Sequence, residues 1–112
     1  MSRPPSARDG FGNQMDVFAA LGDPTRREVL RRVAVGPTTA TRLALEMPIS
    51  RQAVSKHLSA LDEAGLVERT VSGREVRYSL RAEPLSDVVG WVTEVGKAWD
   101  QRLATLKSRL DG

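Results

Sequence analysis

Residues 49–80 constrain the fold of this chain more than any other stretch, because they join a helical pattern directly to a strand pattern. Ser50 is a favourable N-cap residue, and apolar side chains follow it at the three- and four-residue spacing of a helix. Gly65 can adopt the left-handed backbone that commonly ends a helix. A helix capped by Ser50 is therefore predicted to run to Ala64.

Two strands are predicted next, over residues 67–71 and 74–80. In the second strand apolar and polar residues alternate, which is the two-residue period of a half-buried strand. The Ser72–Gly73 pair between them suits a two-residue turn, because glycine accepts positive φ at no steric cost. The sequence thus predicts a hairpin packed beside the helix.

Three shorter helices are predicted upstream. The first covers residues 15–21, and the second covers residues 24–35 after an Asp-Pro start. The third follows a threonine cap, Thr38 or Thr39, and ends before Pro48, since proline disfavours helix in the residue before it. The third and fourth helices make a helix-turn-helix pattern. The residues expected to face the core are Val29, Leu30, Val33, Leu43, Ala44, Met47, Ile49, Val54, Leu58 and Leu61.

A long helix is predicted from Pro84 to about Leu110. Its apolar positions recur about every 3.6 residues, the α-helical period. This stripe could pack on its own domain, but a small helical core leaves too little surface to cover it. A long exposed apolar stripe usually indicates a partner. The positions are Leu85, Val88, Val92, Val95, Trp99, Leu103, Leu106 and Leu110.

These elements predict a mainly α fold with five helices and one small β-hairpin. The chain has 112 residues, of which 40% are hydrophobic and 28% charged, so we expect one globular domain at residues 14–112. A disordered tail is expected at residues 1–13, where Pro and Gly are frequent. The absence of cysteine, of a secretory leader pattern at the start and of a long apolar run favours a cytoplasmic protein without a membrane helix.

Positive charge is concentrated in the middle of the chain. Residues 24–80 hold ten Lys or Arg against six Asp or Glu, while the net charge of the whole chain is only +3. A basic block suits a polyanion such as DNA, although solvated surface arginines would give the same count. The four arginines of the second helix are expected at the surface, with Arg26 bonded to Asp23.

The outward face of the fourth helix is suited to double-stranded DNA. With its apolar side against the core, the polar residues lie roughly 100° to 200° away on the helical wheel. Gln can bond an adenine edge, Lys can reach guanine or phosphate, and Ser can bond either base or backbone. A polar, merely solvated face is the alternative, but its short side chains favour base reading. The predicted contacts are Ser50, Arg51, Gln52, Ser55, Lys56 and Ser59.

Three further residues are candidates for DNA contact. Arg74 follows the hairpin turn, where it can enter a minor groove or hold a phosphate. Arg77 can do the same or pair across the strands with Glu68 or Glu75, and the two explanations are equally supported. His57 lies at the edge of the buried side, where the wheel slightly favours packing or a structural hydrogen bond over DNA contact.

The chain resembles the ArsR-type family of small bacterial winged-helix repressors. Three segments carry the resemblance: ALGDPTRREVL at residues 20–30, SRQAVSKHLSALDEAGLV at 50–67 and SGREVRYSL at 72–80. Together the matching part spans about residues 15–110. The resemblance implies a winged helix-turn-helix in which the hairpin is the wing.

The family also implies a homodimer in which the first and last helices form the interface. It places Gln52, Ser55, Lys56 and His57 at the DNA groove and Arg74 on the wing, so for His57 the resemblance differs from the wheel. The implied dimer residues are Met15, Phe18, Leu85, Val88, Val92, Val95, Trp99, Leu103 and Leu106.

Metal sensing is not expected in this chain. Where metal-sensing members of the family carry a cysteine pair, it has Thr39 and Thr41, and hydroxyl groups are poor ligands for soft metals. The last helix has no histidine. The chain therefore resembles the metal-independent branch, whose signals vary, and the sequence predicts no cofactor and no particular inducer.

Three functions remain open at this point. The first is a sequence-specific, dimeric transcriptional regulator, most often a repressor in such families, on a pseudo-palindromic operator. The second is a non-specific architectural DNA-binding protein, which the modest net charge disfavours. The third is a protein-interaction module that binds no DNA. An enzyme is not expected, because the sequence has no cysteine, one histidine and no Gly-rich phosphate loop.

Overall fold

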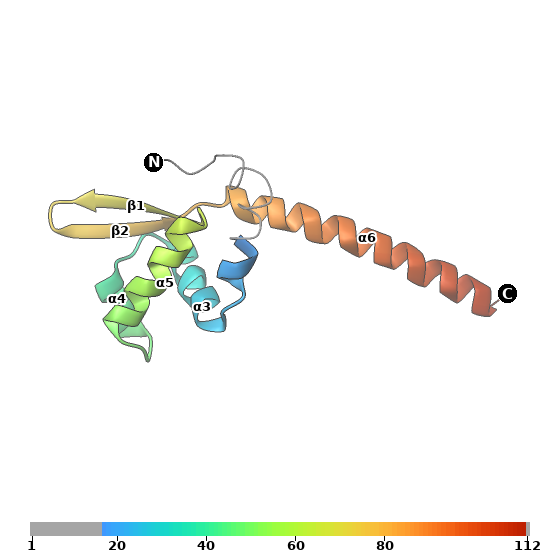
Figure 1. Cartoon of the computed structure of the whole chain (residues 1–112), viewed down its shortest axis with the longest axis horizontal. Coiled ribbons are helices and arrows are strands. Elements are labelled where there is room, and N and C mark those ends of the chain that lie inside the picture. Colours follow the sequence, from blue (N-terminus) through green and yellow to red (C-terminus); the bar gives the residue numbers. More distant parts are fainter. Residues whose placement is uncertain (1–16, 112) are drawn as a thin grey trace, which may run out of the picture.

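The computed structural model describes residues 17–111, in which five helices and one antiparallel hairpin follow one another (Figure 1). The predicted mainly α fold with a two-stranded wing is confirmed. The predicted tail at residues 1–13 and Met15 lie outside the described residues. The elements are a short helix at residues 17–21, α3 (Pro24–Val35), α4 (Ala40–Glu46), α5 (Arg51–Glu63), β1 (Val67–Ser72), β2 (Glu75–Leu80) and α6 (Glu83–Asp111).

The three central helices begin at side-chain caps that the sequence encodes. Asp23 accepts the backbone N–H of Thr25 at 2.8 Å at the start of α3, as predicted for an Asp-Pro start. Of the two candidate threonines, Thr39 caps α4, and its hydroxyl accepts the N–H of Arg42 at 3.1 Å. Ser50 caps α5 and accepts the N–H of Ala53 at 3.1 Å.

The end of α5 is fixed by Gly65, whose φ of +77° lies in the left-handed region. The N–H of Gly65 donates to the carbonyl of Asp62 at 3.0 Å, and that of Leu66 to the carbonyl of Leu61 at 2.9 Å. This pair of bonds satisfies carbonyls that would otherwise be left free at the helix end. It also turns the chain directly into β1.

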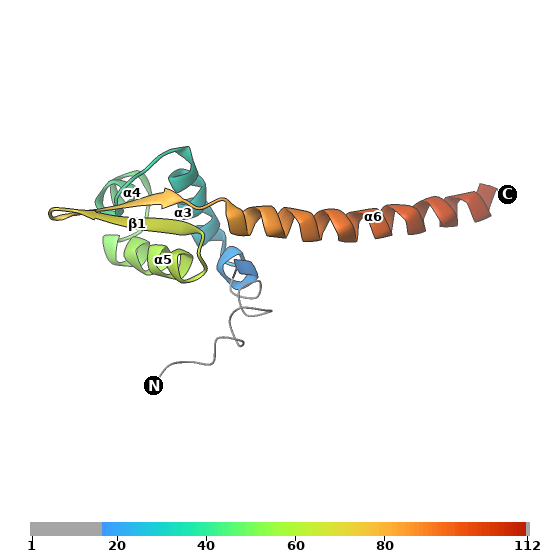
Figure 2. The same ribbon diagram turned by 90° about the horizontal axis from the view of Figure 1, so that it is seen from above.

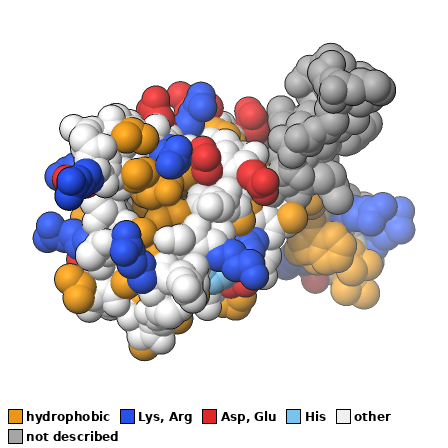
Figure 3. Space-filling model, turned by 60° about the vertical axis from the view of Figure 1, so that its left-hand side comes forward, with side chains coloured by type: hydrophobic (Ala, Val, Ile, Leu, Met, Phe, Trp, Pro, Cys, Tyr) orange, Lys and Arg blue, Asp and Glu red, His pale blue; other side chains and the backbone are white. Residues whose placement is uncertain are grey.

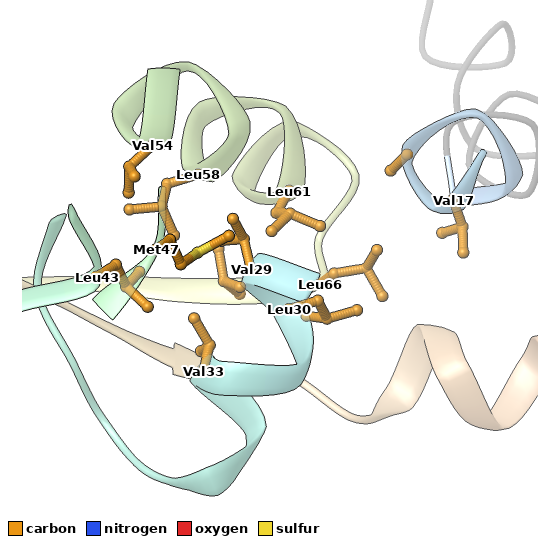
Figure 4. Packing of buried hydrophobic residues seen from close by; sticks show 12 residues of the cluster. Val17, Val29, Leu30, Val33, Leu43, Met47, Val54, Leu58, Leu61 and Leu66 are labelled. Atoms are coloured by element: carbon orange, nitrogen blue, oxygen red, sulfur yellow. The ribbon is translucent and has the colours of Figure 1, made fainter. Parts of the chain in front are cut away.

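The core lies between α3, α4 and α5 and is closed by the start of β1. Side chains of α5 point toward those of α3, with Met47 between the helices (Figure 4). All the apolar positions predicted for α3 and α5 are buried, and Ala44 and Ile49 pack at the margin of the core. The fully buried residues in this cluster are Val29, Val33, Leu43, Val54, Leu58, Leu61, Leu66 and Val67. Burial of this many aliphatic groups fixes which side of α5 faces outward.

The hairpin differs from the predicted one at its turn. Ser72 pairs with Glu75, so the turn residues are Gly73 and Arg74 and not Ser72 and Gly73. Gly73 has a φ of +61°, and no non-glycine residue in the described part has positive φ. Positive φ at the first turn residue alone is the requirement of a type II′ hairpin turn, which glycine meets. Arg74 therefore lies in the turn itself.

The wing is tied to the helix-turn-helix through the loop between α3 and α4. The N–H of Thr38 donates to the carbonyl of Tyr78 at 3.0 Å, and the N–H of Tyr78 donates back to Thr38 at 2.8 Å. This bridge gives β2 a hydrogen-bonded neighbour on both sides. It sets the position of the wing relative to α4 and α5.

Helix α6 leaves the domain and extends away from it in both views (Figures 1 and 2). Only its first turns touch the core, where Leu85 and Val88 are half-buried. Trp91 meets Phe18 edge to face, with ring centroids 5.3 Å apart. Beyond Trp91 the stripe of Val92, Val95, Trp99, Leu103, Leu106 and Leu110 is exposed. The own-domain explanation therefore holds for Leu85 and Val88 alone. No helix in residues 17–111 is long and apolar enough to cross a membrane.

Candidate nucleic-acid interface

The face of α5 opposite the core carries the predicted contact residues. Arg51, Gln52, Ser55, Lys56 and Ser59 are all exposed. Their exposure follows from the complete burial of the other side of the helix, since α5 can present only one face to solvent. Ser50 lies just before this face, where its hydroxyl oxygen is already used as the N-cap acceptor.

His57 is half-buried at the margin of this face, as the helical wheel predicted. An electrostatic effect of His57 makes a minor contribution to the lowered pKa of Asp23. The pKa of Asp23 lies below its ordinary value, first because the N–H of Arg26 donates to the carboxylate and also because the N–H of Thr25 does. DNA contact by His57 stays a prediction.

The arginines of α3 have partners within the protein. The prediction that the Arg26 side chain bonds Asp23 is wrong, because Asp23 accepts the backbone N–H of Arg26. The guanidinium of Arg26 donates instead to the carbonyls of Ala19 and Ala20, at 3.3 and 3.4 Å. Arg27 likewise donates to the carbonyl of Leu21 at 2.7 Å. These two arginines therefore hold the end of the helix at residues 17–21.

The other two arginines of α3 form ion pairs. Arg31 and Arg32 both pair with Glu28, and Arg32 also reaches Glu46 on α4 at 3.5 Å. These pairs are partly exposed, so each contributes little to stability. They neutralise positive charge on α3 and join α3 to α4.

The wing carries two of the candidate arginines in different settings. Arg74 is exposed at the tip and has no ion pair with another described residue. Arg77 pairs with Glu75 at 3.0 Å, so of the two explanations left open an ion pair is present, but it lies along one strand and not across the two. The residue directly opposite Arg77 is Thr70, while Glu68 lies opposite Ser79. This pair uses only the Nε of Arg77 and leaves its terminal guanidinium nitrogens available.

A groove of about 460 Å³ joins the wing to the start of α4 and α5. Arg51 and Ser55 of α5 contribute to its lining, as do Arg74 and Glu75 of the wing, Thr39 at the N-cap of α4 and Thr41 within α4. At this end of the molecule Lys and Arg side chains lie on a surface of mostly uncharged side chains, with Asp and Glu side chains along its upper edge in the view (Figure 3). The lining holds two guanidinium groups and several hydroxyl groups beside the carboxylate of Glu75, and the guanidinium and hydroxyl donors are suited to phosphate oxygens.

The sequence reading missed the part that α4 plays in this groove. The sequence predicts Thr39 as a candidate helix cap and marks Thr39 and Thr41 as positions without cysteine, but it does not predict that both line a groove with Arg51 and Arg74. The missing signal was the bridge between Thr38 and Tyr78, which brings the wing over α4. No local pattern in the sequence encodes that long-range pair.

Residues 21–70 match the helix-turn-helix domain family. The transcriptional repressor SdpR of Bacillus subtilis is 35% identical over 77 residues, which are 69% of this chain and 86% of that protein. The transcriptional regulator CmtR of Mycobacterium tuberculosis is 40% identical over 81 residues, which are 72% of this chain and 69% of that protein. The chain belongs to the ArsR-type family of winged helix-turn-helix regulators. This membership confirms the expected family and the expectation of a regulator rather than an enzyme.

A solved ArsR-type structure has the same fold over most of the chain. The ArsR-like transcriptional regulator from Rhodococcus sp. RHA1 is 41% identical, with a TM-score of 0.73, and the match covers 88% of this chain and 92% of that one. The match reaches beyond the helix-turn-helix domain at residues 21–70. The ArsR-type fold of this chain therefore includes more than its helix-turn-helix domain.

The described part of this ArsR-type chain contains no group of three His, Cys, Asp or Glu residues that could hold a metal ion. The whole sequence also lacks cysteine, the soft ligand of many metal sites. Metal independence stays a prediction for this member of the family.

Proposed function

We propose that this chain is a sequence-specific transcriptional repressor that binds a pseudo-palindromic operator as a homodimer in the cytoplasm. The observation that carries this proposal is the groove in which the outward face of α5 meets Arg74 of the wing. A repressor of this kind acts by occupying its operator and blocking polymerase. Each part of the proposal rests on a separate group of residues.

Base reading is assigned to the exposed face of α5. A 13-residue helix is about 20 Å long, and an α-helix fits the major groove. Gln52 can form two hydrogen bonds with an adenine edge, and Lys56 can reach guanine acceptors or a phosphate. Ser55, His57 and Ser59 lie on or beside the same face and complete the proposed set.

Phosphate binding is assigned to the groove between α5 and the wing. Arg51 and Arg74 come from segments far apart in the sequence, yet both line it. Contacts to phosphate fix the register of a protein on DNA without reading its sequence. Arg77 has a lesser part in this proposal, because its Nε is paired with Glu75, which offsets its charge. Ser50 contributes mainly by capping α5.

Dimerisation is assigned to the exposed stripe of α6 together with the helix at residues 17–21. Within residues 17–111, no part of the domain covers this stripe beyond Trp91. Burying it against a second copy would remove a large apolar surface from water. Two copies related by a two-fold axis would present two α5 helices to successive major grooves, which is why the operator should be a pseudo-palindrome.

The experiment begins with selection of bound fragments from genomic DNA, followed by fluorescence anisotropy on the selected site. Gln52→Ala should relax preference at one base position by about 1–3 kcal/mol. Gln101→Ala is the matched control, because Gln101 is exposed on α6 and lies away from α5. An unchanged base preference in Gln52→Ala would remove that residue from the reading face.

Arg74→Ala should weaken binding to all sequences and lower the dependence of affinity on salt. Arg109→Ala is its control, since it removes the same charge from the last turn of α6. Equal losses in the two variants would show that net charge and not the groove governs affinity. Equal affinity for the selected site and for random DNA, or no binding at low salt, would refute the proposed function.

A further inference from the structure

A second cavity, of about 240 Å³, lies where three elements of the protein meet. The helix at residues 17–21, the end of α5 and the start of α6 all contribute to its lining. These elements include the proposed DNA-reading helix and the proposed dimerisation helix. The cavity is separate from the groove between α5 and the wing, and the two share no lining residue.

One wall of the cavity is apolar and aromatic. Phe18 and Trp91 meet there with ring planes inclined by 67°, and Val17 and Val88 lie beside them. Trp91 keeps 52% of its surface exposed, so the Phe18 contact leaves much of the indole accessible. An accessible indole face attracts cations as well as apolar groups.

The rim of the cavity is acidic. Glu63 from α5 and Glu83 and Asp87 from α6 face a single cation, Arg81. None of these four side chains forms an ion pair with another residue in the range 17–111. Three carboxylates against one guanidinium leave a net charge of −2. The groove beside the wing has the opposite balance, with Arg51 and Arg74 against Glu75.

The charge of the rim decides which class of ligand the cavity suits. An anion such as phosphate would face uncompensated carboxylates, whereas a cation would gain from them and from the indole ring. Clefts for drug-sized ligands usually measure roughly 300–1,000 Å³, so this one suits a smaller molecule. The apolar wall would hold the uncharged body of that molecule out of water.

We propose that this cavity binds a small organic cation, with its charged group at the carboxylates of Glu83 and Asp87 and its apolar body against Trp91. The cavity is positioned to act as an effector site, since its lining joins α5 to α6. A ligand held there alters DNA affinity only as far as it prefers one arrangement of these helices. The effector role rests on the proposed function, but binding of the cation does not.

The test uses isothermal titration calorimetry on the full chain with benzyltrimethylammonium as the probe. Benzyl alcohol and phenylacetate serve as neutral and anionic comparisons with the same ring. The cation should bind at least tenfold more tightly than the alcohol, and phenylacetate should bind most weakly. Comparable binding of all three would reduce the cavity to a non-selective apolar surface and overturn the proposal.

Charge and ring are tested separately by substitution. Glu83→Gln and Asp87→Asn should each weaken cation binding about threefold or more, while Glu94→Gln, an exposed change further along α6, should not. Trp91→Leu keeps an apolar wall but should reduce the preference for the cation over benzyl alcohol. Circular dichroism shows whether each variant remains folded.

Two further results would overturn the proposal. The first is an equal loss in Glu94→Gln and Asp87→Asn, which would indicate a general charge effect. The second is no binding of the cation at millimolar concentration. DNA binding by the same preparation, measured in parallel, distinguishes failure of this site from failure of the proposed function.

Discussion

Leu103 offers a direct test of the role of α6, because its side chain is not buried within its own chain. It is 46% exposed, and no residue of α6 is buried. Leu103→Ala removes three carbon atoms, which contribute about 2.4 kcal/mol when fully buried, at about 0.8 kcal/mol per CH₂. About half of that, about 1 kcal/mol, is available for burial against a partner.

A two-fold interface contains the residue twice, so the expected loss is about 2 kcal/mol for each dimer. This corresponds to an increase of about 30-fold in the dimer dissociation constant. Sedimentation equilibrium at several protein concentrations measures that constant. The helix content of the variant should stay the same, because Ala has at least the helix propensity of Leu.

Gln101→Ala is the matched control for this measurement. Gln101 lies on the side of α6 opposite the apolar stripe, two residues from Leu103, and it is exposed. Its replacement should change the dissociation constant less than twofold. If the two variants dimerise equally well, the stripe is not the interface and its exposure needs another explanation.

Three further predictions concern caps and glycines. The pKa of Asp23 is lowered, so its carboxylate stabilises the fold above about pH 4 and loses that effect as the pH falls through its pKa in the folded protein. The melting temperature of Asp23→Asn should therefore fall less between pH 5 and pH 2 than that of the parent protein. Gly65→Ala should lower the free energy of unfolding in urea by about 1 kcal/mol. The new Cβ would meet only Pro84 at 3.9 Å, so this loss comes from the φ of +77°. Gly65→Asn should lower the free energy of unfolding by less, because asparagine tolerates positive φ better. Gly90→Ala and Gly96→Ala both add a Cβ in open space, and each should stabilise an isolated α6 by about 1 kcal/mol. Only Gly96 lies on the side of the apolar stripe, so only Gly96→Ala should raise the dimer dissociation constant. Equal dissociation constants for the two variants would exclude a close approach of the partner helix at Gly96.

The helices and their boundaries were largely predictable because their signals are local. Thr39 and Ser50 cap the helices that follow them, and Gly65 ends α5 one residue after its C-cap. The buried and exposed sides of α5 followed from the spacing of its apolar residues. The turn of the hairpin was misplaced by one residue, since Ser72–Gly73 and Gly73–Arg74 both contain the required glycine and only the register separates them.

The amino-acid sequence by itself determined which segments are helical, which face of α5 is polar and that α6 carries an unusually long apolar stripe. Each of these depends on residues within a few positions of one another. The tertiary structure decided which groups meet: Thr38 with Tyr78, Arg26 with the carbonyls of Ala19 and Ala20, and Arg51 with Arg74 around one groove. Such contacts join residues distant in the chain, and their positions are fixed only when the apolar core packs the helices and the wing together.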